Sequence, residues 1–178
     1  MNAVPAKLPR AATQELCRGC GLCCDGSLFW AVEVDAAEAL PAPAKTHSAA
    51  DGQLAQPCRF HQGGACSIYA TRPHQCRAFV CDVLSAVQEG TRDLAWGRAR
   101  IEAMRHLLAG LDDALPGEGA LYGRAAAYLE DADSLPDDAR LRARIAVYRD
   151  MIGDFRPLSD PAFTDPAPSD PPNPNAAP

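Results

Sequence analysis

The chain has 178 residues, of which 47% are hydrophobic, 22% charged and 6% aromatic. This length suits one domain with short extensions, since a typical domain holds about 100–150 residues. The net charge of −6 argues against a general nucleic-acid-binding protein, and no apolar run approaches the roughly 20 residues that a membrane span requires. We therefore expect neither a nucleic-acid nor a membrane partner.

The beginning of the sequence is rich in proline and lacks an apolar stretch. Residues 1–13 are therefore predicted to be a flexible N-terminus rather than a secretory signal. A protein without an export signal is expected in the cytoplasm, where thiols stay reduced. The alternative is an exported protein whose cysteines form four disulfides.

All eight cysteines of the chain fall in one part of the sequence. They are Cys17, Cys20, Cys23, Cys24, Cys58, Cys66, Cys76 and Cys81. Reduced thiols at this density are typical of sites that bind a soft or borderline metal, for which thiolate is a preferred ligand. We therefore predict that all eight cysteines are metal ligands.

The first four cysteines follow one another at gaps of two, two and no residues. A two-residue gap lets two sulfurs reach one metal at about 2.3 Å. Neighbouring residues of an extended backbone point to opposite faces, so Cys23 and Cys24 are expected either to face two metals or to comprise one ligand and one core residue. Two four-thiolate sites and one polynuclear cluster with shared ligands both remain open.

Short strands and loops are predicted between and around the cysteines. Residues 27–34 alternate in hydrophobicity as a strand does, and residues 35–40 resemble one or two helical turns capped by Asp35. Residues 41–57 resemble a loop. Residues 58–70 are predicted to form a hairpin, because two adjacent glycines suit its turn.

The last four cysteines are too far apart in sequence for one local turn, so they must converge through folding. Four neighbouring side chains are predicted to act around the metal: Arg72, Arg77, His61 and His74. A four-thiolate site around a divalent ion carries a net charge of −2, and a guanidinium group beside it would offset this charge and lower the thiol pKa. Either histidine is also able to replace a thiolate in a mixed site.

The second half of the sequence predicts helices. Apolar residues recur at three- and four-residue steps over residues 82–111, and this stretch is divided near Thr91, which is predicted to cap the second helix. A further helix is predicted over residues 121–129. A start signature at Ser134 opens the last helix, which continues to Ile152.

These elements predict an α+β fold, in which a small cysteine-rich metal-binding domain of loops and short strands packs on an α-helical C-terminal half. The expected boundaries are a flexible N-terminus at 1–13, the cysteine-cluster domain at 14–85, a helical region at 86–154 and a disordered tail at 155–178. The tail is rich in Pro, Asp and Ala and holds eight of the sixteen prolines, which leaves too few backbone donors for regular structure.

Three motifs carry a resemblance to a known family. They are CxxCxxCC from Cys17 to Cys24, GxCSIY from Gly64 to Tyr69, and RPxxCRxF from Arg72 to Phe79. In these motifs the chain resembles the bacterial YkgJ-type cysteine-cluster family, which implies a zinc- or iron-chelating domain over about residues 14–85. A related cluster in flagellin lysine methylases is thought to hold iron–sulfur and to support methyl transfer. This sequence shows no glycine-rich methyl-donor motif after a strand.

The sequence therefore predicts a protein that binds zinc or iron through cysteine thiolates. One alternative is an iron–sulfur protein in electron transfer or in a redox or methyl-transfer enzyme. Another is a zinc-stabilised module whose acidic helices bind a protein partner. The sequence contains no evident pattern of a nucleophile beside a base, which favours binding over catalysis.

Overall fold

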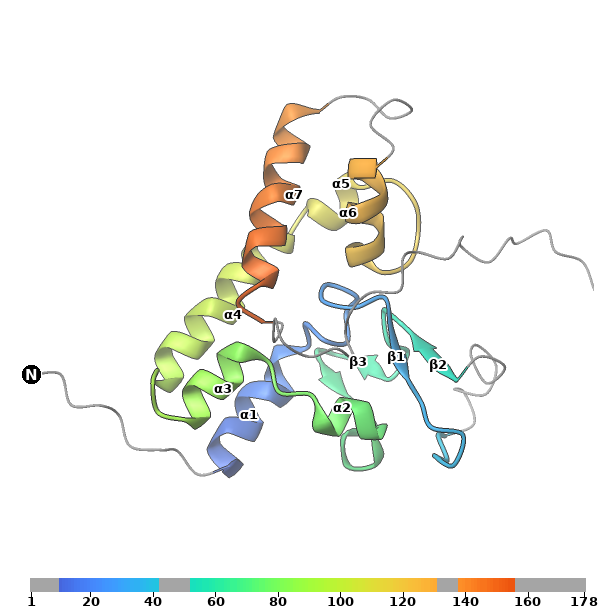
Figure 1. Ribbon diagram of the computed structural model, residues 1–178, viewed down its shortest axis with the longest axis vertical. Helices are drawn as coiled ribbons and strands as arrows, with labels where there is room; N and C mark the ends of the chain where they lie inside the picture. The colour runs from blue at the N-terminus through green and yellow to red at the C-terminus, as the bar shows by residue number, and fades with distance from the viewer. Residues whose placement is uncertain (1–9, 42–51, 131–137, 156–178) are drawn as a thin grey trace, which may run out of the picture.

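The computed structural model describes residues 10–41, 52–130 and 138–155 (Figure 1). The helices are α1 (Arg10–Cys20), α2 (His74–Ala78), α3 (Asp82–Gln88), α4 (Leu94–Leu108), α5 (Leu111–Ala114), α6 (Leu121–Glu130) and α7 (Ala139–Ile152), with a 3-10 turn η2 (Tyr69–Thr71). The strands are β1 (Ala31–Glu33), β2 (Gln53–Ala55), β3 (His61–Gln62) and β4 (Ala65–Cys66). The predicted mixed α+β fold, with short strands in the cysteine half and helices in the C-terminal half, is confirmed.

The first sheet is an antiparallel pair of β1 and β2, in which Val32 lies opposite Leu54. The predicted strand over 27–34 is thus reduced to three residues. Its partner β2 falls within residues 41–57, so the prediction of a loop over that whole stretch is wrong. A strand of three residues with one inward apolar side chain is too short to show an alternating pattern, which explains the error.

The second sheet is the hairpin of β3 and β4, which confirms the predicted hairpin. His61 pairs with Cys66 across it, and the two glycines of its turn have φ of +58° and +79°. Residues 35–40 form a turn instead of a helix. There the carbonyl oxygen of Asp35 accepts a hydrogen bond from the N–H of Glu38 at 2.8 Å, and its carboxylate accepts one from the N–H of Ala37.

Helix α1 is the element that the sequence analysis missed. It begins at Arg10, so the prediction of a flexible segment through residue 13 is wrong. Thr13 and Leu16 are buried where α1 packs against α3 and α4, three helices that lie side by side in Figure 1. The stability of α1 thus depends on distant helices, which its own sequence does not reveal.

The division of residues 82–111 into separate helices is confirmed, but its cap is not where we predicted it. Asp93 caps α4, because its carboxylate accepts a hydrogen bond from the N–H of Trp96 at 2.7 Å. Thr91 instead closes α3, where its hydroxyl donates to the carbonyl oxygen of Ala86 at 2.9 Å. Both residue types are good caps, and the path of the chain out of α3 decides between them.

Helix α6 confirms the predicted helix over residues 121–129, and α7 confirms the last one. The start signature at Ser134 lies outside the described residues. Within them, Asp138 caps α7 by accepting hydrogen bonds from the N–H groups of Arg140 and Leu141 at 2.9 and 3.2 Å. None of the helices in the described ranges is long and apolar enough to cross a membrane.

One large apolar core joins the two halves of the chain. Its fully buried members include Leu22, Val83, Met104, Tyr148 and Phe155, which come from the cysteine motif and from α3, α4, α7 and the residues after α7. Phe155, the first residue of the predicted disordered tail, is therefore ordered, and the rest of that tail lies outside the described residues.

A smaller core lies under the two short sheets. Its buried members are Val32, Leu54 and Phe60. The strands here are only two or three residues long, so this part of the fold has little hydrogen bonding and little buried apolar surface of its own. The cysteines lie between the two cores.

Candidate metal site

The CxxCxxCC motif begins inside a helix. Cys17 and Cys20 lie in the last turns of α1, three residues apart, so they share one face. Arg105 of α4 donates hydrogen bonds to the carbonyl oxygens of Gly19 and Cys20, the latter at 2.6 Å, and so satisfies the end of α1. No local pattern in the sequence indicates this role of Arg105, because 85 residues separate it from Cys20.

The turn after α1 holds the adjacent pair Cys23 and Cys24. The N–H of Cys24 donates to the carbonyl oxygen of Gly21 at 2.8 Å, and the carbonyl oxygen of Cys24 accepts from the N–H of Cys58 at 2.7 Å. Leu22 is fully buried in the large core and anchors the turn there. The adjacent cysteines are thereby fixed between the large core and the strand region.

The other four cysteines come from four separate places. Cys58 precedes the hairpin, Cys66 ends β4, Cys76 lies on α2 and Cys81 precedes α3. Cys81 caps α3, because its sulfur accepts a hydrogen bond from the N–H of Leu84 at 3.4 Å. Folding brings these distant positions toward the CxxCxxCC motif, as their wide spacing predicted.

An apolar cavity of about 100 Å³ lies where the two groups of cysteines meet. Seven cysteines line it: Cys17, Cys20, Cys23, Cys24, Cys58, Cys66 and Cys76. The rings of Phe29 and Phe79, which meet edge to face with centroids 5.0 Å apart, form part of the wall. Cys81 does not line the cavity and packs on the large core instead.

All eight cysteines are free thiols and are half-buried. Burial raises the pKa of the Cys20 thiol to about 11 and those of Cys76 and Cys81 to about 12, and it also raises the pKa of Cys23 and Cys24. Such thiols are protonated at pH 7. A metal that binds them must therefore displace their protons.

Backbone N–H groups counter part of this burial effect. Backbone hydrogen bonds from Leu22 to Cys20 and from Phe60 to Cys58 lower the pKa of both thiols, and the N–H of His61, which donates to the carbonyl oxygen of Cys58 at 2.8 Å, adds to the effect on Cys58. Hydrogen bonds of this kind favour the thiolate over the thiol. They are suited to sulfurs that carry negative charge on a metal.

Two polar atoms at the cavity have no partner. The side chains of His61 and Gln56 line it, and both His61 Nε2 and Gln56 Oε1 are buried without a hydrogen bond in the described part of the structure. A buried polar atom without a partner is costly. Together with the thiols, these atoms make the wall of the cavity chemically suited to a metal ion.

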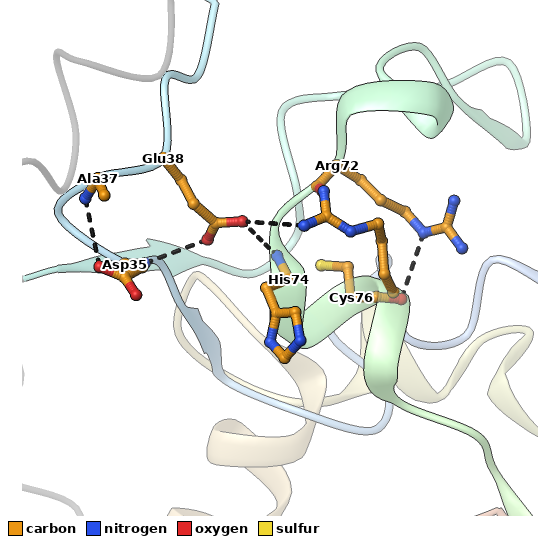
Figure 2. A network of polar contacts seen from close by, with 7 residues as sticks. Asp35, Ala37, Glu38, Arg72, His74 and Cys76 are labelled. Carbon is orange, nitrogen blue, oxygen red and sulfur yellow. Dashed lines mark hydrogen bonds and ion pairs between the residues drawn. The ribbon is translucent and has the colours of Figure 1, made fainter.

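Arg72 lies at the cavity, close enough to the cysteines for its charge to change the pKa of their thiols. Its guanidinium stacks on the ring of Tyr69 at 3.7 Å and donates to the carbonyl oxygen of Cys76 at 3.3 Å (Figure 2). Arg72 lines the cavity, and its positive charge opposes the effect of burial on the pKa of Cys17 and Cys76. Arg18 contacts the same tyrosine ring at 4.8 Å.

Arg77 and His74 lie elsewhere. Neither lines the cavity. The carboxylate of Glu38 contacts both residues. It accepts a hydrogen bond from the backbone N–H of His74 (Figure 2). It also lies 3.6 Å from the guanidinium of Arg77. Arg77 also donates to the carbonyl oxygen of Arg72 at 2.6 Å. These contacts fix the start of α2 rather than reach a thiol.

In the described residues, no three or more Cys, His, Asp or Glu side chains are close enough together to hold a metal ion as they stand. Zinc–thiolate bonds are only about 2.3 Å long, so the ligands of one ion must lie close together. Metal binding would therefore draw the thiols inward from the cavity wall.

The fold and the gathered thiols define a small α+β protein with a cysteine-cluster domain. Residues 16–94 match the model of the CxxCxxCC family, whose description reads "Putative zinc- or iron-chelating domain", and this match confirms the predicted resemblance. The match extends past the expected boundary at residue 85 to the first residue of α4. Neither a curated protein nor a solved structure gives a significant match to the chain.

Gly21 is expected to be sensitive to substitution. Its φ is +75°, and a Cβ there would lie 2.7 Å from Nε2 of His61, so Gly21→Ala is strained by its backbone and by the imidazole. We expect this variant to lose about 1–3 kcal/mol of unfolding free energy in urea denaturation.

Gly19→Ala is the matched control. A Cβ at Gly19 meets nothing within 4 Å, and the residue lies inside α1. Alanine there should stabilise the helix by about 0.5–1 kcal/mol. Equal stability of the two variants would contradict the close approach of His61.

Proposed function

We propose that the protein binds zinc or iron through the thiolates of its eight cysteines, and that the metal holds the cysteine half of the fold together. The observation that supports this most is the lining of one cavity by seven cysteines from separate elements. The N–H groups that donate to Cys20 and Cys58 support it further, because they favour charged sulfur. The description of the family agrees with this chemistry.

The positive charges around the thiols fit the same proposal. The charge of Arg72 lowers the pKa of Cys17 and Cys76. Arg105 has the same effect on Cys20, and Arg59 has it on Cys58. Four thiolates around one divalent ion leave an excess of two negative charges. Guanidinium groups offset such charge at any pH at which the protein is folded.

Metal analysis of protein purified without oxygen tests the proposal. We expect stoichiometric zinc or iron, together with slow alkylation of all eight thiols. A metal-free protein whose thiols react as fast as free cysteine, and which takes up neither ion when it is supplied, would refute the proposed function.

An iron–sulfur cluster is the second candidate, and the size of the cavity favours it. A space of about 100 Å³ with aromatic rings in its wall has room for more than one ion. A brown protein with equal amounts of iron and acid-labile sulfide would establish this form. A colourless protein that contains zinc would exclude it.

Metal binding is expected to release protons. Because burial raises the thiol pKa to about 11 or 12 at Cys20, Cys76 and Cys81, these groups are protonated at neutral pH and ionise only when a metal takes them. Affinity should therefore rise with pH from neutrality toward these pKa values. We expect about four protons per ion for a four-thiolate site, measured by titration in weak buffer. Release of no protons would show that the ligands are not these thiols.

Arg72→Gln is expected to move metal binding to higher pH. Its charge opposes the raised pKa of Cys17 and Cys76, so its loss makes those thiols harder to deprotonate. A competition titration with a chromophoric chelator across pH measures the midpoint. Arg72→Lys keeps the charge, so its midpoint should stay close to that of the wild-type protein.

Arg77→Gln is the matched control for Arg72, five positions away on the same segment. The guanidinium of Arg77 pairs with the carboxylate of Glu38, and its side chain is 46% exposed. The pH midpoint of metal binding in Arg77→Gln should therefore equal that of the wild-type protein. An equal shift in both variants would mean that general charge, rather than contact with the thiols, sets the midpoint.

A further inference from the structure

The cysteines pack on two different apolar cores. Four of them contact the large core: Cys17, Cys20, Cys23 and Cys81. Cys58 and Cys76 contact the small core instead. Cys66 belongs to the hairpin above that small core, and the carbonyl oxygen of Cys24 is hydrogen-bonded to the N–H of Cys58. Packing thus divides six of the cysteines between the cores, and backbone pairing places Cys24 beside Cys58 and Cys66 in the hairpin, which gives two sets of four.

The electrostatic neighbours of the thiols follow the same division. The pKa of Cys81 is raised by the thiols of Cys20 and Cys17, which belong to its own set. The pKa of Cys24 is raised by a different group of thiols: Cys58, Cys76 and Cys66. Across the division, the thiol of Cys24 raises the pKa of its neighbour Cys23.

We infer that the domain has two separate four-cysteine metal sites, one formed by Cys17, Cys20, Cys23 and Cys81 and the other by Cys24, Cys58, Cys66 and Cys76. This inference rests on the proposed function, since it assigns the ligands of the metal proposed there. Two tetrahedral sites use all eight thiols and need no shared ligand. The division between them passes through the peptide bond that joins Cys23 and Cys24.

The local geometry explains why two adjacent residues serve different sites. The turn that begins at Gly21 holds this segment between the cores, with Leu22 buried in the large one and Cys24 hydrogen-bonded to the strand region. Neighbouring side chains on such a backbone leave it in different directions. Arg72 lowers the pKa of one thiol from each set, Cys17 and Cys76, so its charge serves both sites.

Cadmium-113 NMR of the reduced full-length protein tests the inference without any substitution. Two cadmium signals are expected, and proton–cadmium correlations should connect Cys23 and Cys81 to one ion, and Cys24 and Cys66 to the other. Correlations from Cys23 and Cys24 to the same ion, or from any cysteine to both ions, would overturn the two-site assignment. A protein that binds no cadmium, zinc or iron would refute the proposed function as well.

Native mass spectrometry of zinc-loaded variants provides a second test. Cys23→Ser and Cys24→Ser should each retain one of two zinc ions, although they are neighbours. Cys23→Ser combined with Cys81→Ser should still retain one ion, because both substitutions fall in one site. Cys23→Ser combined with Cys24→Ser should retain none. If wild type binds two ions but the Cys23/Cys81 double variant binds none, the assignment fails while the proposed function stands.

Discussion

Removal of the metal with a chelator under reducing conditions is expected to unfold the cysteine half of the protein, residues 17–81. The strands in this part are two or three residues long, and among the described residues the small core has three buried apolar side chains. A structural thiolate site contributes on the order of 10 kcal/mol of apparent folding free energy, which is comparable to the whole stability of a typical domain. Outside the segment that Leu22 anchors in the large core, the strand region has little else to compensate for its loss.

Circular dichroism and hydrogen exchange measure this outcome. We expect a large drop in the unfolding midpoint, and amide protection in β1 to β4 should disappear before that of α7. Addition of zinc to the reduced protein should restore both. An unchanged midpoint after complete metal removal would show that the metal has no structural role.

Tyr148→Ala is expected to give the largest loss of stability among substitutions in the helical half. The ring is fully buried in the large core, and its hydroxyl donates to the carbonyl oxygen of Ser27, three residues after the CxxCxxCC motif. Truncation of a buried aromatic side chain costs about 3–5 kcal/mol. Tyr148→Phe keeps the ring and should cost only about 1–2 kcal/mol, the loss of the hydrogen bond.

Val147→Ala is the control at the neighbouring position, where the side chain is 50% exposed. Its stability in urea denaturation should stay within about 0.5 kcal/mol of wild type. Because Tyr148 connects α7 to the segment after the cysteine motif, we also expect Tyr148→Ala to release metal faster. A cost below about 1 kcal/mol would mean that α7 does not share a cooperative core with the cysteine half.

Local signals account for the predictions that succeeded. The glycines of the β3–β4 turn and the regular apolar steps of α4, α6 and α7 depend on nearby residues alone, so the sequence shows them directly. The spacing of the cysteines likewise indicates metal binding from the sequence alone, because reduced cysteines at this density are typical of metal sites.

Several of the failures involve partners that are distant in sequence. Helix α1 depends on packing against α3 and α4, and β2 on pairing with β1. Arg72 and Arg77 both lie close to Cys76 in the sequence. In the fold, Arg77 pairs with Glu38, whereas Arg72 lines the cavity with the cysteines. Arg105 satisfies the end of α1 from a helix far along the chain, which no local pattern indicates.

The large core also has a consequence for where this protein can be divided. The family match ends at Leu94, so a fragment cut there would contain every cysteine. Yet α4 lies so close to Leu16 and Val87 at Gly97 that a Cβ there would be 3.0 Å from each of them. Such a fragment would contain all the proposed ligands, but the apolar surface of α1 and α3 that packs against α4 would be exposed to solvent. We expect the fragment to self-associate through this surface. The segment that matches the family model is thus smaller than the part of the chain that forms the shared apolar core.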